Sequence, residues 1–310
     1  MRHLEIRPLV ENEAQPYDVV LCAVGYENRA RNVAKQLSIR GRLQLAVGFP
    51  DRHVSGYSEN RRWFETNEFT YIEVSDSEFG ESVCRKAFSS TSKTQVLRIA
   101  IDISSFNRTR LATIVEWLSN SKEYCATAIA HFYYSLASFS EPTHDPAVRN
   151  RHVGPVTPTF AGWSEDPMLP PYAVLGLGYE NGKALGAIDH LEVSNALAFV
   201  PTSPVDEYLP ALISANETLI NTLGSDHVLR YRVHEPIRTF EMVESVVNGL
   251  LPNFNPILLP FGPKIFFVIS LLVALLHPEC SVWRVSAGES ESPSDRTASD
   301  HIISFETNFK

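Results

Sequence analysis

Short apolar runs alternate with longer stretches of mixed polarity along most of this chain. The runs have the length of strands, and the stretches between them are long enough for helices. In 107–120, for example, Leu111, Ile114, Val115 and Leu118 are spaced by three and four, which marks one apolar face of a helix. This order predicts an α/β fold with mainly parallel sheets flanked by helices.

The predicted elements fall into two sets of the same order. The first set has strands near 17–24, 43–49, 69–75, 95–102 and 124–134, with helices near 27–40, 56–67, 79–90 and 107–120. The second set has strands near 172–177, 195–201, 227–233, 255–260 and 280–286, with helices near 182–191, 205–223, 237–250 and 263–276.

A repeated tetrapeptide links the two sets. Gly-Tyr-Glu-Asn occurs at 25–28 and again at 178–181, each time directly after an apolar run. Further matches, 45–50 with 197–201 and 99–102 with 257–260, lie at nearly the same offset. We therefore predict two tandem Rossmann-like units that arose by internal duplication and superpose over 17–134 and 172–286, with Asp102 near Pro260.

The expected domain boundaries follow from composition. The first unit covers 1–137, and 138–171 is a connector with seven prolines that supports no helix. The second unit covers 172–310 and ends in a polar tail, within which 301–305 is a candidate edge strand. A connector of this length is a candidate cover for a site.

Charge and cysteine content exclude several classes of function. With a net charge of -9, the chain is a poor general binder of duplex nucleic acid, although a local basic pocket for a small anion remains compatible. The four cysteines form no CxxC pair, and the histidines lack the spacing of metal ligands, so we expect reduced buried thiols, no metal and no cofactor.

No membrane segment is expected either. The first residues carry charge without an apolar segment behind them, unlike a secretory signal. The most apolar stretch, 265–276, has 12 residues, whereas a spanning helix needs about 20. We expect a cytoplasmic protein in which 263–276 is a buried helix.

In open α/β sheets, ligands bind at the carboxyl ends of the strands, where strand order reverses. The first segment expected there follows the strand 17–24. Its glycine allows a sharp turn, and its amides and arginines favour an anion, although the acid and amide side chains could equally cap the helix. The candidates are Gly25, Tyr26, Glu27, Asn28, Arg29 and Arg31.

A second segment follows the strand 95–102. An acid at the strand end, two hydroxyls and then an arginine at the helix start form a suitable loop for a small ligand. Alternatively, Ser105 is only a helix cap and Asp102 only accepts hydrogen bonds from loop amides. The candidates are Asp102, Ser104, Ser105 and Arg108.

The second unit supplies the remaining candidates. Pro260 stands in the place of Asp102, so the two copies are chemically unequal, and one shared asymmetric pocket is more natural than two equivalent ones. The candidates are Gly178, Tyr179, Glu180, Asn181 and Lys183, followed by Gly262 and Lys264.

Other polar residues are weaker candidates. Tyr57, Glu59, Asn60, Arg61 and Arg62 form either part of the pocket or a solvated helix face, and His131 is a core histidine rather than a base. The sequence contains no Walker A, GxGxxG, GxSxG or HExxH motif, which argues against the familiar dinucleotide, NTPase, hydrolase and metalloprotease chemistries.

The stretch 101–108, Ile-Asp-Ile-Ser-Ser-Phe-Asn-Arg, resembles the loop after the fourth strand of CRISPR-associated Rossmann-fold sensor domains. A fused pair of such units is similar in plan to the related sensor domain of cyclic-oligonucleotide antiphage systems. The resemblance implies binding of a cyclic oligonucleotide across the junction of two units; Pro260 departs from it. Because the two units and the connector take up the chain, we expect a separate protein effector or a homo-oligomer.

Three functions remain open. The leading hypothesis is a nucleotide-binding sensor or regulatory subunit, with a cyclic or linear oligonucleotide in the cleft between the units, in a prokaryotic antiviral defence system. The second is an enzyme acting on a nucleotide or phosphorylated metabolite, with Glu27 or Asp102 as base or nucleophile and Arg108 and Lys264 on the phosphate. The third is a non-catalytic scaffold.

Overall fold

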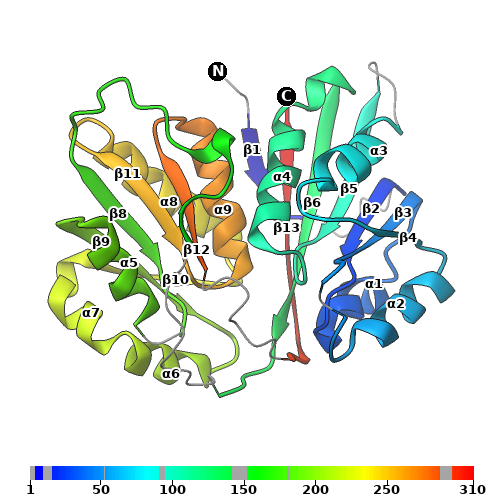
Figure 1. Cartoon of the computed structure of the whole chain (residues 1–310), viewed down its shortest axis with the longest axis horizontal. Coiled ribbons are helices and arrows are strands. Elements are labelled where there is room, and N and C mark those ends of the chain that lie inside the picture. Colours follow the sequence, from blue (N-terminus) through cyan, green and yellow to red (C-terminus); the bar gives the residue numbers. More distant parts are fainter. Residues whose placement is uncertain are drawn as a thin grey trace. The chain divides into compact units, whose positions relative to one another are not determined.

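The structure is a computed structural model that describes residues 4–9, 16–51, 53–90, 95–141, 152–179, 182–286 and 295–310. The chain forms two compact units: unit 1 comprises Met1–Ser138 with Pro293–Lys310, and unit 2 comprises Phe139–Ser292. Each unit contains one sheet of mostly parallel strands flanked by helices (Figure 1). The predicted α/β class with mainly parallel sheets is therefore confirmed.

Unit 1 contains a seven-stranded sheet of order β1-β13-β6-β5-β2-β3-β4. The strands from β6 to β4 are parallel, whereas β13 is antiparallel to both β6 and β1. Strand order reverses at β2, which lies between β5 and β3. The strands are β1 (Leu4–Arg7), β2 (Tyr17–Ala23), β3 (Gly41–Gly48), β4 (Thr70–Glu73), β5 (Val96–Asp102), β6 (Thr127–Ala137) and β13 (Ala298–Phe309). The α-helices are α1 (Asn32–Gln36), α2 (Tyr57–Thr66), α3 (Arg85–Phe88) and α4 (Arg108–Ser119).

Unit 2 contains a six-stranded sheet of order β10-β9-β8-β11-β12-β7. All neighbouring pairs are parallel except β12 with β7. The strands are β7 (His152–Pro155), β8 (Pro171–Gly176), β9 (Asn195–Thr202), β10 (Val228–Arg232), β11 (Asn255–Pro260) and β12 (Ser281–Ser286). The α-helices are α5 (Lys183–Leu191), α6 (Tyr208–Ala215), α7 (Glu217–Leu223), α8 (Pro236–Leu250) and α9 (Lys264–Leu276).

Apolar periodicity accounts for the elements. In β2 the whole run Val19–Ala23 is buried, as expected of a central strand covered on both faces, and α4 buries Leu111, Ile114, Val115 and Leu118. Helix α9 is apolar on all sides, and every residue from Ile265 to Leu275 is buried, which confirms the expected buried helix. In the described part of the chain, no helix is long and apolar enough to cross a membrane.

The end of the chain belongs to a different unit from the one that the sequence predicts. The tail was expected in the second unit, but β13 pairs with β6 and β1 of unit 1. The predicted strand at 301–305 exists inside β13, yet it lies within the sheet rather than at its edge. Ile303, Phe305 and Phe309 are buried there, so the apolar positions of β13 complete the core of unit 1.

Two local predictions are also revised. The connector contains a strand, β7, which pairs with β12, although the residues of it that the structure describes hold no α-helix, as expected. The single helix expected over 205–223 is divided into α6 and α7 at Asn216. At this position the side chain donates both to the carbonyl of Gly178 at 2.7 Å and to that of Leu212 at 2.9 Å.

Candidate functional site

The loops after β2 and β5 meet where strand order reverses in unit 1. A Cβ placed on Gly25 would lie 2.8 Å from Cβ and 3.1 Å from Oγ of Ser105. Only a residue without a side chain fits this contact, so glycine is required for the close approach of the two loops. The structure thus brings together the two segments that the strand-end rule selected in the first unit.

Glu27 and Arg29 form a buried ion pair within the first loop. Their exposed fractions are 9% and 4%, and 2.6 Å separates Arg29 Nε from Glu27 Oε2. Arg29 Nη1 also donates to the carbonyl of Ser135 at 2.9 Å. Burial opposes the charge of the guanidinium, but the Glu27 carboxylate outweighs it and raises the pKa of Arg29. The charge of Arg29 is therefore compensated inside the protein.

A buried amide from α2 holds the same loop. Asn60 is 0% exposed, and its Nδ2 donates to the carbonyls of Gly25 at 2.9 Å and Glu27 at 2.8 Å. Buried carbonyls need such partners, because leaving them without a hydrogen bond costs free energy. Asn60 is therefore neither a solvated helix residue nor an open pocket residue; it fixes the position of the loop.

The second loop is organised by its own side chains. Asp102 Oδ1 accepts a hydrogen bond from the amide of Ser104 at 2.9 Å, and Ser104 Oγ accepts one from the amide of Ser135 at 2.8 Å. The cap of α4 is Asn107, whose Oδ1 accepts from the amide of Arg110 at 2.8 Å. Ser105 is therefore not the cap, and Asp102 does accept from a loop amide.

The most deeply buried cation of unit 1's described residues is Arg110, which the sequence did not single out. It is 0% exposed, and its guanidinium donates to Asp76 at 2.7 Å and to the carbonyls of Gly48 at 2.9 Å and Val74 at 2.5 Å. The guanidinium also lies 3.8 Å from the ring centroid of Phe49. These contacts tie α4 to the carboxyl ends of β3 and β4.

Beside this arginine, several polar side chains surround one carboxylate at the end of β4. Glu73 Oε2 accepts from Tyr71 Oη at 2.5 Å, from His53 Nε2 at 2.9 Å and from Tyr57 Oη at 3.2 Å. Room for them exists because residue 48 is glycine: a Cβ there would lie 2.2 Å from Tyr57 Oη and 2.6 Å from Tyr71 Oη. The hydrogen bond from Tyr71 is the main cause that lowers the pKa of Glu73.

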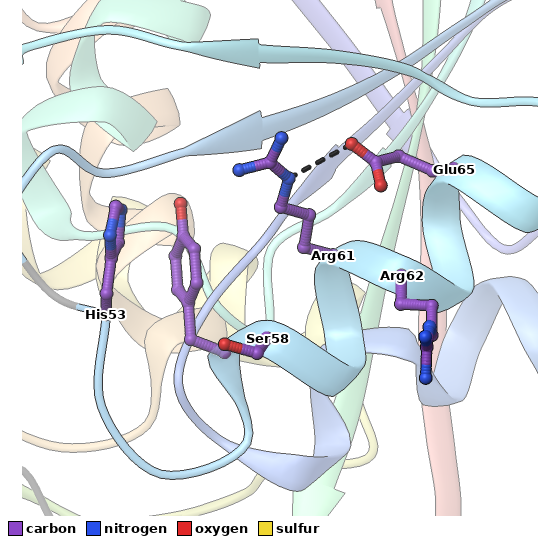
Figure 2. Close-up of a pocket in the computed structure, with 6 residues that line it drawn as sticks. His53, Ser58, Arg61, Arg62 and Glu65 are labelled. Atoms are coloured by element: carbon purple, nitrogen blue, oxygen red, sulfur yellow. Dashed lines mark hydrogen bonds and ion pairs between the residues drawn. The ribbon is translucent and has the colours of Figure 1, made fainter.

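A recess of about 330 Å³ opens next to this cluster on the surface of α2. Figure 2 shows Arg61 turned toward Glu65, whereas Arg62 points in another direction. Arg61 Nε lies 3.0 Å from Glu65 Oε1, and the guanidinium sits 4.2 Å from the ring centroid of Tyr71. The lining residues are His53, Tyr57, Ser58, Arg61, Arg62 and Glu65.

The C-terminal segment of the chain covers part of the first loop. The backbone amide of Asn28 donates to Asp295 Oδ1 at 2.9 Å, and its Nδ2 donates to Asp295 Oδ2 at 2.5 Å. The amide of Arg29 donates to the carbonyl of Arg296 at 3.2 Å. An internal carboxylate thus already contacts the amides at which the sequence predicts an anion.

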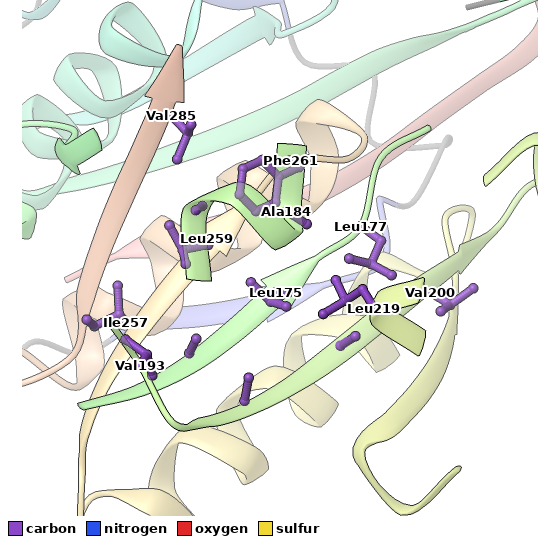
Figure 3. Packing of buried hydrophobic residues seen from close by; sticks show 14 of the residues in the cluster. Leu175, Leu177, Ala184, Val193, Val200, Leu219, Ile257, Leu259, Phe261 and Val285 are labelled. Atoms are coloured by element: carbon purple, nitrogen blue, oxygen red, sulfur yellow. The ribbon is translucent and has the colours of Figure 1, made fainter. Parts of the chain in front are cut away.

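In unit 2, described residues at the corresponding strand ends belong to an apolar cluster. Figure 3 shows Leu177, Leu259 and Phe261 in the hydrophobic cluster around the strand ends. Tyr179 contacts the rings of Phe139 and Tyr208, with centroids 6.5 and 5.5 Å apart. Two of the predicted residues, Glu180 and Asn181, lie outside the described residues.

The glycines of unit 2 have packing roles. A Cβ on Gly262 would lie 2.3 Å from the carbonyl oxygen of Leu177, and the amide of Gly262 donates to the carbonyl of Gly176 at 2.9 Å. Gly178 accepts a hydrogen bond from Nδ2 of buried Asn216 at 2.7 Å. The predicted cations Lys183 and Lys264 are the first residues of α5 and α9.

The structure therefore joins Gly25 to Ser105 and Glu27 to Arg29, while convergence of all four loops on one ligand stays a prediction. His53, Tyr71 and Glu73 were missed. The strand-end rule itself selects Glu73, the last residue of β4, but its acidic side chain stands in a short and weakly apolar strand that gives little signal. Residues that the structure describes include no cluster of three or more acidic, histidine or cysteine groups able to hold a metal ion.

Comparisons with known proteins add no family to this description. No protein-family model matches the sequence. No curated protein matches it either. Function is therefore argued from the geometry of the two units.

Proposed function

We propose that this chain is a nucleotide-binding sensor or regulatory subunit built from two copies of one Rossmann-like unit. Its ligand is a phosphorylated nucleotide, with a cyclic or linear oligonucleotide as the form that the sequence resemblance suggests. The ligand binds at the carboxyl ends of the parallel strands, where α/β sheets bind ligands in general. Its effector is a separate protein or a second copy of the chain.

Strand order supports the duplication. In chain order, the five parallel strands of each unit are arranged with the first between the fourth and the second. The pairing register also corresponds, since Ala23 pairs with Val47 in unit 1 and Gly176 pairs with Phe199 in unit 2. Gly25 and Gly178 both follow two residues after these positions, so the repeated tetrapeptide begins at the same place in each sheet.

The observation that carries the proposal is a shared contact at these glycines. The carbonyl of Gly25 accepts from Nδ2 of Asn60 at 2.9 Å, and the carbonyl of Gly178 accepts from Nδ2 of Asn216 at 2.7 Å. Both asparagines follow the second strand of their unit and both are buried. A duplicated strand-end loop, held rigid by the same amide, is a suitable frame for a ligand.

The register refines one expected correspondence. Leu21 pairs with Ile101 in unit 1, and Val174, which corresponds to Leu21, pairs with Leu258 in unit 2. Asp102 therefore corresponds to Leu259, one residue before the expected Pro260. Whether Asp102 is aligned with Leu259 or with Pro260, unit 2 has no acidic residue at this position.

Cations at two helix starts support a phosphorylated ligand. Arg108 is the first residue of α4, and Lys264 is the first residue of α9, each following the fourth parallel strand of its unit. Positive side chains near helix amides suit a phosphate group. An enzyme is less well supported, because the carboxylate of Glu27 is paired with Arg29 and that of Asp102 accepts from the amide of Ser104.

The proposal is tested by incubating the full chain with mononucleotides, dinucleotides and cyclic oligonucleotides, followed by mass spectrometry of bound and released species. Recovery of intact ligand supports a sensor, whereas a converted product supports an enzyme. Arg108→Ala and Lys264→Ala should each weaken binding roughly 10- to 150-fold, because a charged hydrogen bond is worth about 1.5–3 kcal/mol.

Lys122→Ala is the control, since Lys122 is exposed and lies in the 3₁₀ turn after α4. Its loss should change affinity little, because exposed charges contribute at most about 1 kcal/mol. If neither Arg108→Ala nor Lys264→Ala alters the binding of any nucleotide, the strand-end proposal is wrong and a scaffold function takes its place.

A further inference from the structure

We propose that the recess on α2 is the subsite that holds one nucleotide unit: the base lies against His53 and the phosphate contacts Arg61. The inference rests on the proposed function and names the place in unit 1 where such a ligand is recognised. It differs from the strand-end loops after β2 and β5, because the recess is lined by residues of α2 and by His53, which lies between β3 and α2.

The aromatic side chains of the recess are held in place by contacts within the protein. Tyr57 is 2% exposed, and its ring lies 4.3 Å from that of His53 at an interplanar angle of 30°. The His53 side chain is 45% exposed and is held through Nε2 by Glu73. Because the His53 imidazole is held by Glu73 and is partly exposed, it offers a flat face on which a nucleobase can stack.

The carboxylate of Glu73 stabilises this arrangement. It accepts hydrogen bonds from His53, Tyr57 and Tyr71, and its lowered pKa keeps it ionised at neutral pH. Tyr57 and Tyr71 reach it because Gly48 leaves space for both hydroxyls. Side chains that are fixed by such partners lose little entropy when a ligand binds.

The opposite side of the recess is cationic. Arg61 and Arg62 line it, although the whole chain carries a net charge of -9. Arg61 is 46% exposed and paired with Glu65, which is equally exposed. An exposed pair of this kind is weak, so a phosphate can replace Glu65 as the partner of the guanidinium at small cost.

Size and composition fit a mononucleotide unit. A volume of about 330 Å³ stands at the lower end of small-molecule sites, which span roughly 300–1,000 Å³. The recess offers the ring of His53 and the guanidinium group of Arg61. This set recognises a flat ring linked to an anion better than either part alone.

Adenosine 5′-monophosphate, adenosine and inorganic phosphate are the probes, titrated calorimetrically into the full chain at low salt. Stacking on an aromatic side chain is worth roughly 5- to 100-fold in affinity. His53→Ala and Arg61→Ala should each weaken the monophosphate about tenfold. His53→Ala should spare inorganic phosphate, Arg61→Ala should spare adenosine, and Glu65→Gln should tighten the monophosphate.

Arg85→Ala is the matched control for Arg61→Ala. Arg85 also forms an ion pair four residues along a helical segment, with Glu81 at 2.6 Å, and it also lies over an aromatic ring, that of Trp117 at 6.0 Å. Arg85 does not line the recess. Its loss should leave binding unchanged, and circular dichroism should show that every variant is folded.

The outcomes separate this inference from the proposed function. Weakened binding in His53→Ala and Arg61→Ala, with Arg85→Ala unchanged, supports the subsite. If the monophosphate binds these variants as it binds the wild type while Arg108→Ala loses affinity, the subsite is wrong and the proposed function stands. If the wild type binds none of the probes and no oligonucleotide, both are wrong.

Discussion

The two units share a strand order but differ in chemistry at the ends of their strands. In unit 1, the loops after the first and fourth parallel strands contain the buried Glu27–Arg29 pair and Asp102. In unit 2, the corresponding loops place Leu259 and Phe261 in an apolar cluster. Of the charged residues near these positions in unit 2, Lys183 and Lys264 begin α5 and α9, and Glu180 lies outside the described residues.

One helix position shows the difference most clearly. The third residue of α4 is Arg110 and the third residue of α9 is Phe266, and both are 0% exposed. Arg110 donates to Asp76 and to carbonyls at the ends of β3 and β4. Phe266 instead packs on Phe199 and Tyr231, with ring centroids 5.5 and 4.9 Å away.

The comparison teaches that the same packing position can be filled by hydrogen bonds or by apolar contact. A buried guanidinium needs an acceptor for its donors, so it restricts the surrounding loops to one arrangement. An aromatic ring fills the volume without that requirement. At this helix position, unit 1 is therefore the more tightly specified and unit 2 the more tolerant of substitution.

The largest expected effect on the free energy of unfolding follows from replacing Arg110 and Phe266, one at a time, by methionine. Arg110→Met should lower the free energy of unfolding of unit 1 by about 3 kcal/mol or more, because buried carbonyls lose their donor at about 1–3 kcal/mol each. Phe266→Met should cost unit 2 at most about 1.5 kcal/mol, as apolar swaps of similar volume do. Urea unfolding followed by circular dichroism measures both losses of stability. Equal losses for Arg110→Met and Phe266→Met would contradict the difference between the two units.

A smaller loss of stability is expected from removing the buried asparagine that holds the strand-end loop in each unit. Asn60→Ala and Asn216→Ala each remove a buried amide that donates to two carbonyls. Each should destabilise its unit by about 1–3 kcal/mol. Asn67→Ala, at the end of α2, removes a half-buried side chain that donates to Trp63 and should cost less. If only one buried asparagine matters, the strand-end loops are not held in the same way.

The smallest effect concerns acid sensitivity in unit 1. His131 Nε2 donates to Glu306 at 2.9 Å, and Tyr17 Oη lies 2.6 Å from Nδ1. Burial lowers the pKa of His131 below its ordinary 6.5 in spite of Glu306. Burial would raise the pKa of Glu306, but hydrogen bonds from Arg7 and His131 outweigh it and lower that pKa.

For a depressed pKa, the unfolded chain takes up the proton first as the pH falls. The burial of neutral His131 therefore makes its full contribution to the free energy of unfolding above about pH 6.5. That contribution is lost as the pH falls toward the folded pKa of His131, by at most about 1.4 kcal/mol per pH unit. Glu306 adds a similar loss below its ordinary 4.5. His131→Gln should flatten the pH dependence of unfolding just below pH 6.5, measured by urea titration, and an unchanged slope would contradict this origin.

Local pattern was sufficient for most elements. Apolar runs located the parallel strands, and the spacing of Leu111 to Leu118 located the buried face of α4, because periodicity depends only on neighbouring residues. The repeated tetrapeptide located the two strand-end loops. The division of 205–223 at Asn216 was not predicted in this way, and the contact of Asn216 with the carbonyl of Gly178, 38 residues earlier, is not encoded in local periodicity.

The sequence by itself determined the α/β class, the chain order of the parallel strands, and the buried helix α9, because each is encoded in nearest-neighbour periodicity. Only the tertiary structure decided that β13 joins unit 1, that Glu27 pairs with Arg29, and that His53, Tyr71 and Glu73 gather beside Gly48. The pairing of β13 and the cluster beside Gly48 depend on which distant segments the fold brings together, and the burial of the Glu27–Arg29 pair depends on how the surrounding chain packs. The charge of a side chain can be read from the sequence, whereas its burial and its hydrogen-bond or ion-pair partner are properties of the folded chain.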